Sequence, residues 1–144
     1  MIELFTALRR LSLPLIAAVN GDALMSGFSL VCASDIVVAV EEARLGVTEA
    51  GDAYWPMMTP LPLLVRLVRH HALENIVDRD PFDARRAREI GVVSDVVPAD
   101  RLVAATESWV ARATGPGTPS RVRRGVDRTP ILHRWGAQAT TQTG

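Results

Sequence analysis

Two junctions in the first third of this 144-residue chain carry residue types that could do chemistry. At the first junction, an apolar run ends in Asn20-Gly21, and the small residues of Met25-Ser26-Gly27 begin an expected helix. Backbone N–H groups at a helix N-terminus lack partners and, with the helix dipole, suit an anion or a developing oxyanion. The second junction holds Glu49, a carboxylate after a short expected strand at 44–47. A strand–turn–helix joint can also be purely structural, so spacing alone leaves both interpretations open.

The elements that must position these groups alternate between helix and strand. Helical spacing of apolar residues and short β-branched runs distinguish the two. The expected helices cover 2–11, 26–34, 63–76, 84–90 and 99–113, and the expected strands cover 15–19, 36–40, 44–47 and 92–97. Asp83 is expected to cap the fourth helix and Gly91 to end it. This order predicts an α/β fold.

Composition excludes several classes of protein. With 48% hydrophobic and 22% charged residues the chain is globular, and its 16 basic and 16 acidic residues do not suit a dedicated nucleic-acid binder. All basic residues are Arg, so no lysine is available for Schiff-base or P-loop chemistry. One cysteine excludes an internal disulfide and a multi-cysteine zinc site. With no targeting signal and no membrane-spanning run, we expect a cytoplasmic protein without metal or membrane.

The composition changes near the C-terminus. Residues 115–120 are rich in Gly and Pro and suggest a linker, and the segment 115–144 holds five Arg and one Asp. We therefore expect one domain over 1–114 and a flexible Arg-rich tail over 115–144. The tail could contact the phosphates of a ligand or of nucleic acid, or it could simply be solvated, and we expect the solvated tail without a nucleic-acid partner.

Residues 14–49 resemble the central signature of the enoyl-CoA hydratase/isomerase family, the crotonase superfamily. A second block, 59–102, resembles the later part of that family, a helix followed by a segment that begins with Phe-Asp-Ala. The likeness extends over about residues 3–112. The matching residues are Pro14, Ile16 to Gly21, Ala23, Gly27, Asp35-Ile36, Gly46 and Glu49, then Phe82-Asp83-Ala84, Ala87, Gly91-Val92-Val93 and Val96-Val97-Pro98.

The resemblance implies a fold and an activity. The fold would be a partial crotonase-like spiral core of ββα units, with C-terminal helices. Members bind acyl-CoA thioesters, with coenzyme A as part of the substrate and no further cofactor, and two backbone N–H groups stabilise an enolate oxyanion. Ser26 stands at one of these donors. The family usually assembles in trimers, which implies a homo-oligomer or association with full-length relatives.

The departures from the family pattern point to a reduced site. The second oxyanion donor belongs to a segment well before Pro14, and the chain starts thirteen residues before Pro14. Hydratases have two carboxylates, at the positions of Ser29 and Glu49, and here only Glu49 is acidic. One base is enough to move a double bond, which implies a single-Glu, isomerase-like site. The alternatives are a truncated, non-catalytic family member, in which Glu49 is only a surface carboxylate, and a small Arg-tailed binding module.

The expected site therefore combines few residues. Glu49 would be the base and Ser26 the oxyanion donor. The thioester would contact Ala23, Met25 and Gly27, and the acyl chain Trp55 and Met57, although the last two could equally be core. Outside the site, we expect Asp35 to support the scaffold, Cys32 to be a buried small hydrophobe, and His70-His71 to lie at a solvated helix end.

Overall fold

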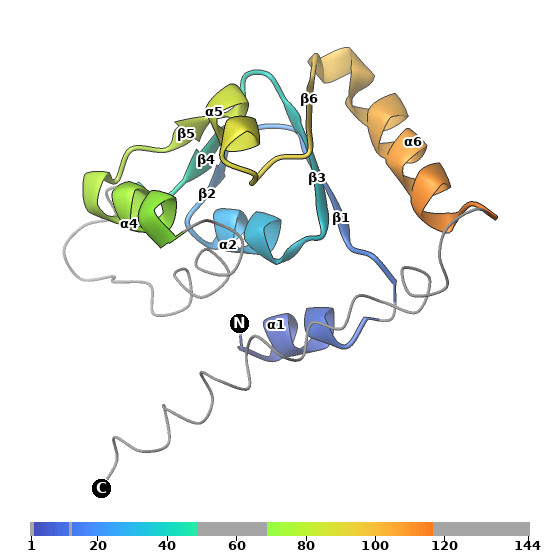
Figure 1. Ribbon diagram of the computed structural model, residues 1–144, viewed down its shortest axis with the longest axis horizontal. Coiled ribbons are helices and arrows are strands. Elements are labelled where there is room, and N and C mark those ends of the chain that lie inside the picture. Colours follow the sequence, from blue (N-terminus) through green and yellow to red (C-terminus); the bar gives the residue numbers. More distant parts are fainter. Residues whose placement is uncertain (1, 12, 49–68, 117–144) are drawn as a thin grey trace, which may run out of the picture.

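Two small three-stranded sheets organise the chain (Figure 1). The computed structural model describes residues 2–11, 13–48 and 69–116. The first sheet has the order β1 (Ile16–Val19), β3 (Ile36–Val40), β6 (Asp95–Val97), and all of its strands are parallel. Four of the five residues of β3 are buried, as expected for the central strand of a parallel sheet whose faces are both covered.

The second sheet has shorter strands and lies beside the candidate site. It has the order β2 (Ala23–Leu24), β4 (Arg44–Gly46), β5 (Phe82–Asp83). β2 pairs parallel to β4, whereas β5 pairs antiparallel to β4. This pairing brings the start of helix α2 (Ser26–Ala33) next to the end of β4.

Helices surround the two sheets (Figure 1). α6 packs against β1 and β3, and α2 packs against β2. In Figure 1, α1 lies apart from both sheets. The helices are α1 (Ile2–Arg9), α2 (Ser26–Ala33), α4 (Arg69–Asp78), α5 (Ala84–Glu89), the 3₁₀ turn η1 (Ala99–Arg101) and α6 (Leu102–Thr114).

The buried core joins the first sheet to α2, α5 and the start of α6. Apart from Phe28, Leu45 and Leu102, it is built from small and β-branched side chains, which allow close packing of helices on a parallel sheet. Its members are Val19, Phe28, Val31, Cys32, Val37, Val38, Ala39, Val40, Ala43, Leu45, Ala84, Ala87, Ile90, Val92, Val93 and Leu102.

The predicted α/β fold is confirmed, and several elements lie where the sequence indicated. β3 has the predicted bounds, and α1, β1, α2 and β4 lie within one or two residues of theirs. Asp83 caps α5 by accepting a hydrogen bond from the Arg86 N–H at 2.7 Å, and Gly91 follows with a φ of 85°. The small-residue prediction for Cys32 also holds, since its side chain is 5% exposed.

The strand predicted over 92–97 is wrong in its first half. β6 begins only at Asp95, and the N–H groups of Val92 and Val93 both donate to the Ala87 carbonyl, at 2.8 and 3.1 Å. These valines are buried at the end of α5 instead of in the sheet. Their apolar character therefore reflects core packing and not strand pairing.

Other differences concern short or partly described elements. β2 and β5 were not predicted, because two-residue strands carry no readable periodicity. Of the helix predicted over 63–76, the described part is α4, which extends to Asp78, whereas 63–68 lie outside the described residues. The helix predicted over 99–113 begins as the η1 turn. The proposed tail boundary follows α6, and residues from 117 on lie outside the described part.

Candidate functional site

The start of α2 is the predicted oxyanion site, and its geometry is set by Met25. Met25 donates its N–H to the Gly46 carbonyl at 2.9 Å, which ties the helix start to the end of β4. The first helical hydrogen bond runs from the Ser29 N–H to the Met25 carbonyl at 3.0 Å. The N–H groups of Ser26, Gly27 and Phe28 therefore precede the helical ladder, as at any helix N-terminus. Ser26 is exposed and Gly27 is partly exposed, so a ligand can approach this turn.

Met25 has an unusual backbone conformation. Its φ is 53° and its ψ is −114°, a region that non-glycine residues rarely adopt. Such conformations cost on the order of 1–3 kcal/mol and cluster at functional sites. A glycine at this position would adopt the same turn without strain. The sequence indicated a bulky residue here but not the strain.

Gly46 ends β4 and accepts the Met25 N–H, and its position requires glycine. Its φ is 153°, and a Cβ built on it would lie 2.9 Å from the Asn75 Nδ2 and 3.0 Å from the Pro81 Cα. A side chain at this position would therefore collide with both α4 and the segment before β5. This explains physically why a glycine precedes the predicted base by three residues.

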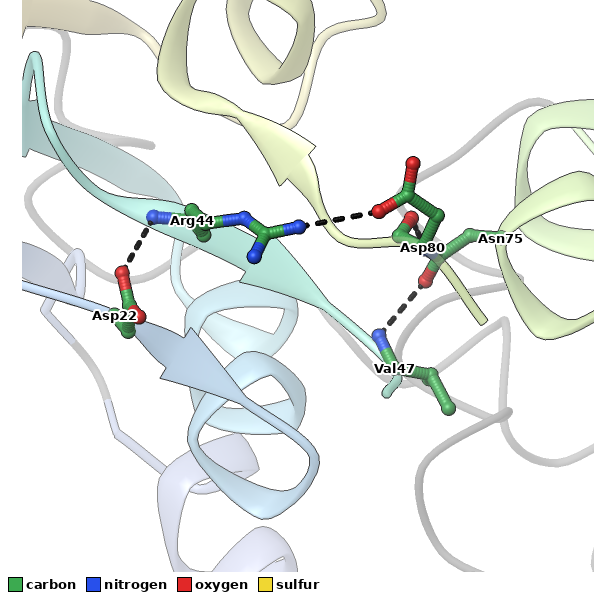
Figure 2. A network of polar contacts seen from close by, with 5 residues as sticks. All are labelled: Asp22, Arg44, Val47, Asn75 and Asp80. Atoms are coloured by element: carbon green, nitrogen blue, oxygen red, sulfur yellow. Dashed lines mark hydrogen bonds and ion pairs between the residues drawn. The ribbon is translucent and has the colours of Figure 1, made fainter. Parts of the chain in front are cut away.

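Asn75 completes the arrangement and was missed by the sequence analysis. It is 1% exposed, its Oδ1 accepts from the Val47 N–H at 2.9 Å, and its Nδ2 donates to the Asp80 carbonyl at 2.7 Å (Figure 2). A buried side-chain amide is tolerated in a protein core when its oxygen and its nitrogen are both hydrogen-bonded, as they are here. The available signal was a polar residue seven positions after Val68, on the predicted apolar stripe of the helix.

Ser29 is the residue that the resemblance sets at the position of the other hydratase glutamate. Its side chain is buried, with 2% exposed, and its Oγ donates to the Met25 carbonyl at 3.2 Å. A hydroxyl that is bonded to its own helix and buried has no means of activating water. At this position the chain therefore offers scaffold and not an acid or base.

The structure places only part of the predicted site. Ala23 is half-buried in β2 opposite Leu45, next to the Met25-Ser26-Gly27 turn. The predicted base Glu49 and the predicted acyl contacts Trp55 and Met57 lie outside the described residues. Glu49 follows Val47 by two residues in the chain.

Residues predicted to be structural are also accounted for. The Asp35 Oδ2 accepts from the Leu15 N–H at 2.7 Å, which holds the entry to β1 beside β3 and confirms a scaffold role. His71 Nδ1 lies 3.3 Å from Glu74 Oε2 on the exposed side of α4. Across the described ranges, no group of three or more His, Cys, Asp or Glu side chains could hold a metal ion, and no helix is long and apolar enough to cross a membrane.

Comparisons with known proteins agree with this fold. Residues 1–121 match the family model described as enoyl-CoA hydratase/isomerase. The chain is 39% identical over 116 residues to the mevalonyl-coenzyme A hydratase sidH of Aspergillus fumigatus, a match that covers 80% of this chain and 43% of that protein. The chain spans less than half the length of this relative and of other curated relatives. One of them is the 2,3-dehydroadipyl-CoA hydratase of Escherichia coli, which is 37% identical over 99 residues, and the match covers 68% of this chain and 39% of that protein.

Solved structures give the same result. The human enoyl coenzyme A hydratase domain-containing protein 3 superposes with a TM-score of 0.72 at 27% identity, over 77% of this chain and 44% of that one. A monofunctional enoyl-CoA isomerase from M. smegmatis superposes with a TM-score of 0.70 at 27% identity, over 99% of this chain and 64% of that one. The fold is thus a partial crotonase-like α/β core, and the chain belongs to the enoyl-CoA hydratase/isomerase family.

Proposed function

We propose that the chain binds an acyl-CoA thioester and stabilises its enolate oxyanion with the Ser26 N–H. The observation that carries this proposal is the exposed start of α2, where the N–H groups of Ser26 and Gly27 precede the first helical hydrogen bond. Donors fixed before the reaction stabilise the charge that develops on the thioester oxygen. No metal or separate cofactor is part of the proposal, since coenzyme A arrives with the substrate.

The reaction that fits the available groups is isomerisation of a 3-enoyl-CoA to a 2-enoyl-CoA. Glu49 would remove a proton from C2, the electrons would move onto the thioester oxygen, and the same carboxyl would return the proton at C4. One carboxyl group is enough for this step. Addition of water needs a further group, and the buried Ser29 does not supply it.

Names of relatives support the substrate class. The Aspergillus fumigatus protein is named a mevalonyl-coenzyme A hydratase, and the M. smegmatis protein is described as an enoyl-CoA isomerase. Both names specify a coenzyme A thioester, and they differ in the reaction. Coenzyme A recognition is therefore the common element that we extend to this chain.

The test supplies a 3-enoyl-CoA, for isomerisation, and a 2-enoyl-CoA, for hydration, to the purified chain and to the Glu49→Gln variant. We expect a slow conversion of 3-enoyl-CoA that Glu49→Gln abolishes and that Glu42→Gln, a change at an exposed turn carboxylate, leaves within about twofold. Hydration without isomerisation would overturn the assignment. Activity that survives Glu49→Gln would overturn the role of the base.

The second hypothesis is a non-catalytic family member that associates with full-length relatives. The observation that favours it is a serine, buried at 2% exposed, where the resemblance expects one of the two family carboxylates. It predicts binding of acyl-CoA, or of a relative, without turnover of either substrate. Co-sedimentation with a full-length family member, combined with the same turnover assay, separates the two hypotheses.

A further inference from the structure

One buried side chain connects α4 to the strand end that holds the start of α2 (Figure 2). Asn75 lies on α4, and its carboxamide bridges two backbone segments. Its Oδ1 accepts from the Val47 N–H at 2.9 Å, directly after β4. Its Nδ2 donates to the Asp80 carbonyl at 2.7 Å, just before β5. Both ends of the amide are thus used on backbone groups.

The segment that Asn75 holds is the one that holds Met25. Gly46 precedes Val47, and the Gly46 carbonyl accepts the Met25 N–H at 2.9 Å. The peptide group after Met25 carries the N–H of Ser26. A displacement of Gly46 and Val47 would therefore reorient the peptide that the proposed function uses as its oxyanion donor.

Packing leaves this connection little freedom. A Cβ at Gly46 would lie only 2.9 Å from Nδ2 and 3.1 Å from Oδ1 of Asn75, so the backbone of Gly46 lies directly against the amide. Asn75 and Val47 are both buried, at 1% and 8% exposed. With water excluded, the unpaired Val47 N–H would carry the full desolvation cost if the amide oxygen were removed.

We infer that Asn75 is a positioning residue for the Ser26 N–H. It fixes Val47 and Gly46, and through the Gly46 carbonyl it fixes the Met25 peptide that begins α2. The inference rests on the proposed function for its consequence in thioester binding. It assigns no contact between Asn75 and the substrate.

The other end of β4 is held differently. The Asp22 Oδ1 accepts from the Arg44 N–H at 2.9 Å, and Arg44 Nη2 lies 3.1 Å from Asp80 Oδ1 (Figure 2). The side chains of this ion pair are 55% and 80% exposed, so solvent screens it. The buried amide is therefore the side-chain bond that holds the Gly46 end of β4, beside the strand pairing of Gly46 with Leu24.

The experiment compares Asn75→Leu and Asn75→Asp with the wild-type chain of 144 residues. Leucine removes both hydrogen bonds at similar volume, whereas aspartate keeps an acceptor for the Val47 N–H. Ser94→Ala is the matched control, because the Ser94 Oγ accepts from the Val37 N–H at 3.1 Å in the other sheet. Two quantities are measured: amide hydrogen exchange at Met25, Val47 and Val37, and the Kd for acetyl-CoA.

We expect Asn75→Leu to accelerate exchange at Val47 and Met25 and to weaken acetyl-CoA binding, each roughly tenfold or more, as loss of a buried hydrogen bond implies. Asn75→Asp is measured at a pH low enough to keep the carboxyl protonated, because only the protonated form can both accept from the Val47 N–H and donate to the Asp80 carbonyl. In that form it should retain more of both, and it keeps the test decisive if the leucine variant does not fold. Ser94→Ala should accelerate exchange at Val37 and leave Met25 exchange and acetyl-CoA binding within about twofold, since separated sites act independently.

This design separates failure of the positioning role of Asn75 from failure of the proposed function. Unchanged Met25 exchange in both Asn75 variants, with Val47 exchange accelerated, would overturn the positioning role. Equal loss of acetyl-CoA binding in Asn75→Leu and Ser94→Ala would also overturn it, since the effect would then be general destabilisation. If the wild-type chain does not bind acetyl-CoA, the proposed function fails, and the exchange rates still decide the role of Asn75.

Discussion

Met25 combines a bulky side chain with a backbone turn that suits glycine. Its φ of 53° is held by the bond from its N–H to the Gly46 carbonyl and by the first turn of α2. Strain of this kind persists only where the surroundings dictate the conformation. The site therefore stores conformational energy at the residue directly before the proposed oxyanion donor.

Replacing Met25 by glycine should stabilise the chain. Relief of about 1–3 kcal/mol of strain exceeds the roughly 0.5–1 kcal/mol entropic cost of a glycine, so we expect a net gain of about 1 kcal/mol. Denaturant unfolding monitored by circular dichroism measures it. Met25→Ala is the control, because it removes the side chain but keeps the strained φ. A gain that alanine reproduces would attribute the effect to crowding and not to strain.

Gly46 and Gly27 provide a matched pair of glycines. A Cβ at Gly46 would collide with Asn75 and the Pro81 backbone, whereas a Cβ at Gly27 would meet no atom within 4 Å. We expect Gly46→Ala to lose about 2 kcal/mol or more of unfolding free energy. Gly27→Ala should lose nothing, or gain up to about 1 kcal/mol as a helical residue, while the added methyl weakens acetyl-CoA binding. Equal stabilities for the two variants would contradict this account of Gly46.

What the sequence predicted at the residue scale depended on local rules. Asp83 and Gly91 follow helix-capping chemistry, which acts over four residues, and both were predicted correctly. The bridging role of Asn75 and the strained backbone of Met25 were not predicted, because they depend on Gly46 and Val47, and Asn75 lies 28 residues from Val47 along the chain. The sequence indicates a side-chain hydrogen bond over such a separation only by an unexpected polar residue among apolar positions.

At the scale of elements, α5 shows how a short helix is held in place. It has six residues, too few to be stable alone, and it buries Ala84 and Ala87 against the core. Its N-terminus depends on Asp83, and its C-terminal turn receives the Val92 and Val93 N–H groups. The valines that the sequence suggested as strand thus serve to end a helix, a distinction that apolar character alone does not reveal.

Loss of the Asp83 cap should destabilise the chain measurably. We expect Asp83→Ala to lower the free energy of unfolding by about 0.5–2 kcal/mol, since the Arg86 N–H loses its acceptor at 2.7 Å. Thermal unfolding measures the change. Asp83→Asn keeps an acceptor oxygen and should stay close to wild type. A similar loss for asparagine and alanine would mean that charge, and not the cap, carries the effect.

At the scale of the molecule, topology was predicted in class but not in detail. The alternation of helix and strand indicated an α/β chain, and the family signature indicated the crotonase-like core that the superpositions confirm. The division into two sheets was not predictable, because the strands of the second sheet pair over only two residues each. Ala23 pairs with Leu45, for example, and Leu45 with Phe82. Such pairs arise from tertiary packing and leave no pattern in the sequence.

The outer surface leads to the last prediction, that the purified chain self-associates. In the described part of the chain, β1 pairs with β3 only and forms a sheet edge, and Val103 and Val110 on α6 are 68% and 45% exposed. Open sheet edges and exposed apolar side chains favour association. In sedimentation velocity, the sedimentation coefficient should increase with protein concentration. Val103→Glu combined with Val110→Glu should reduce that dependence more than Val77→Glu, a change at a 73% exposed valine on α4. A sharp monomer with cooperative unfolding at all concentrations would contradict the prediction.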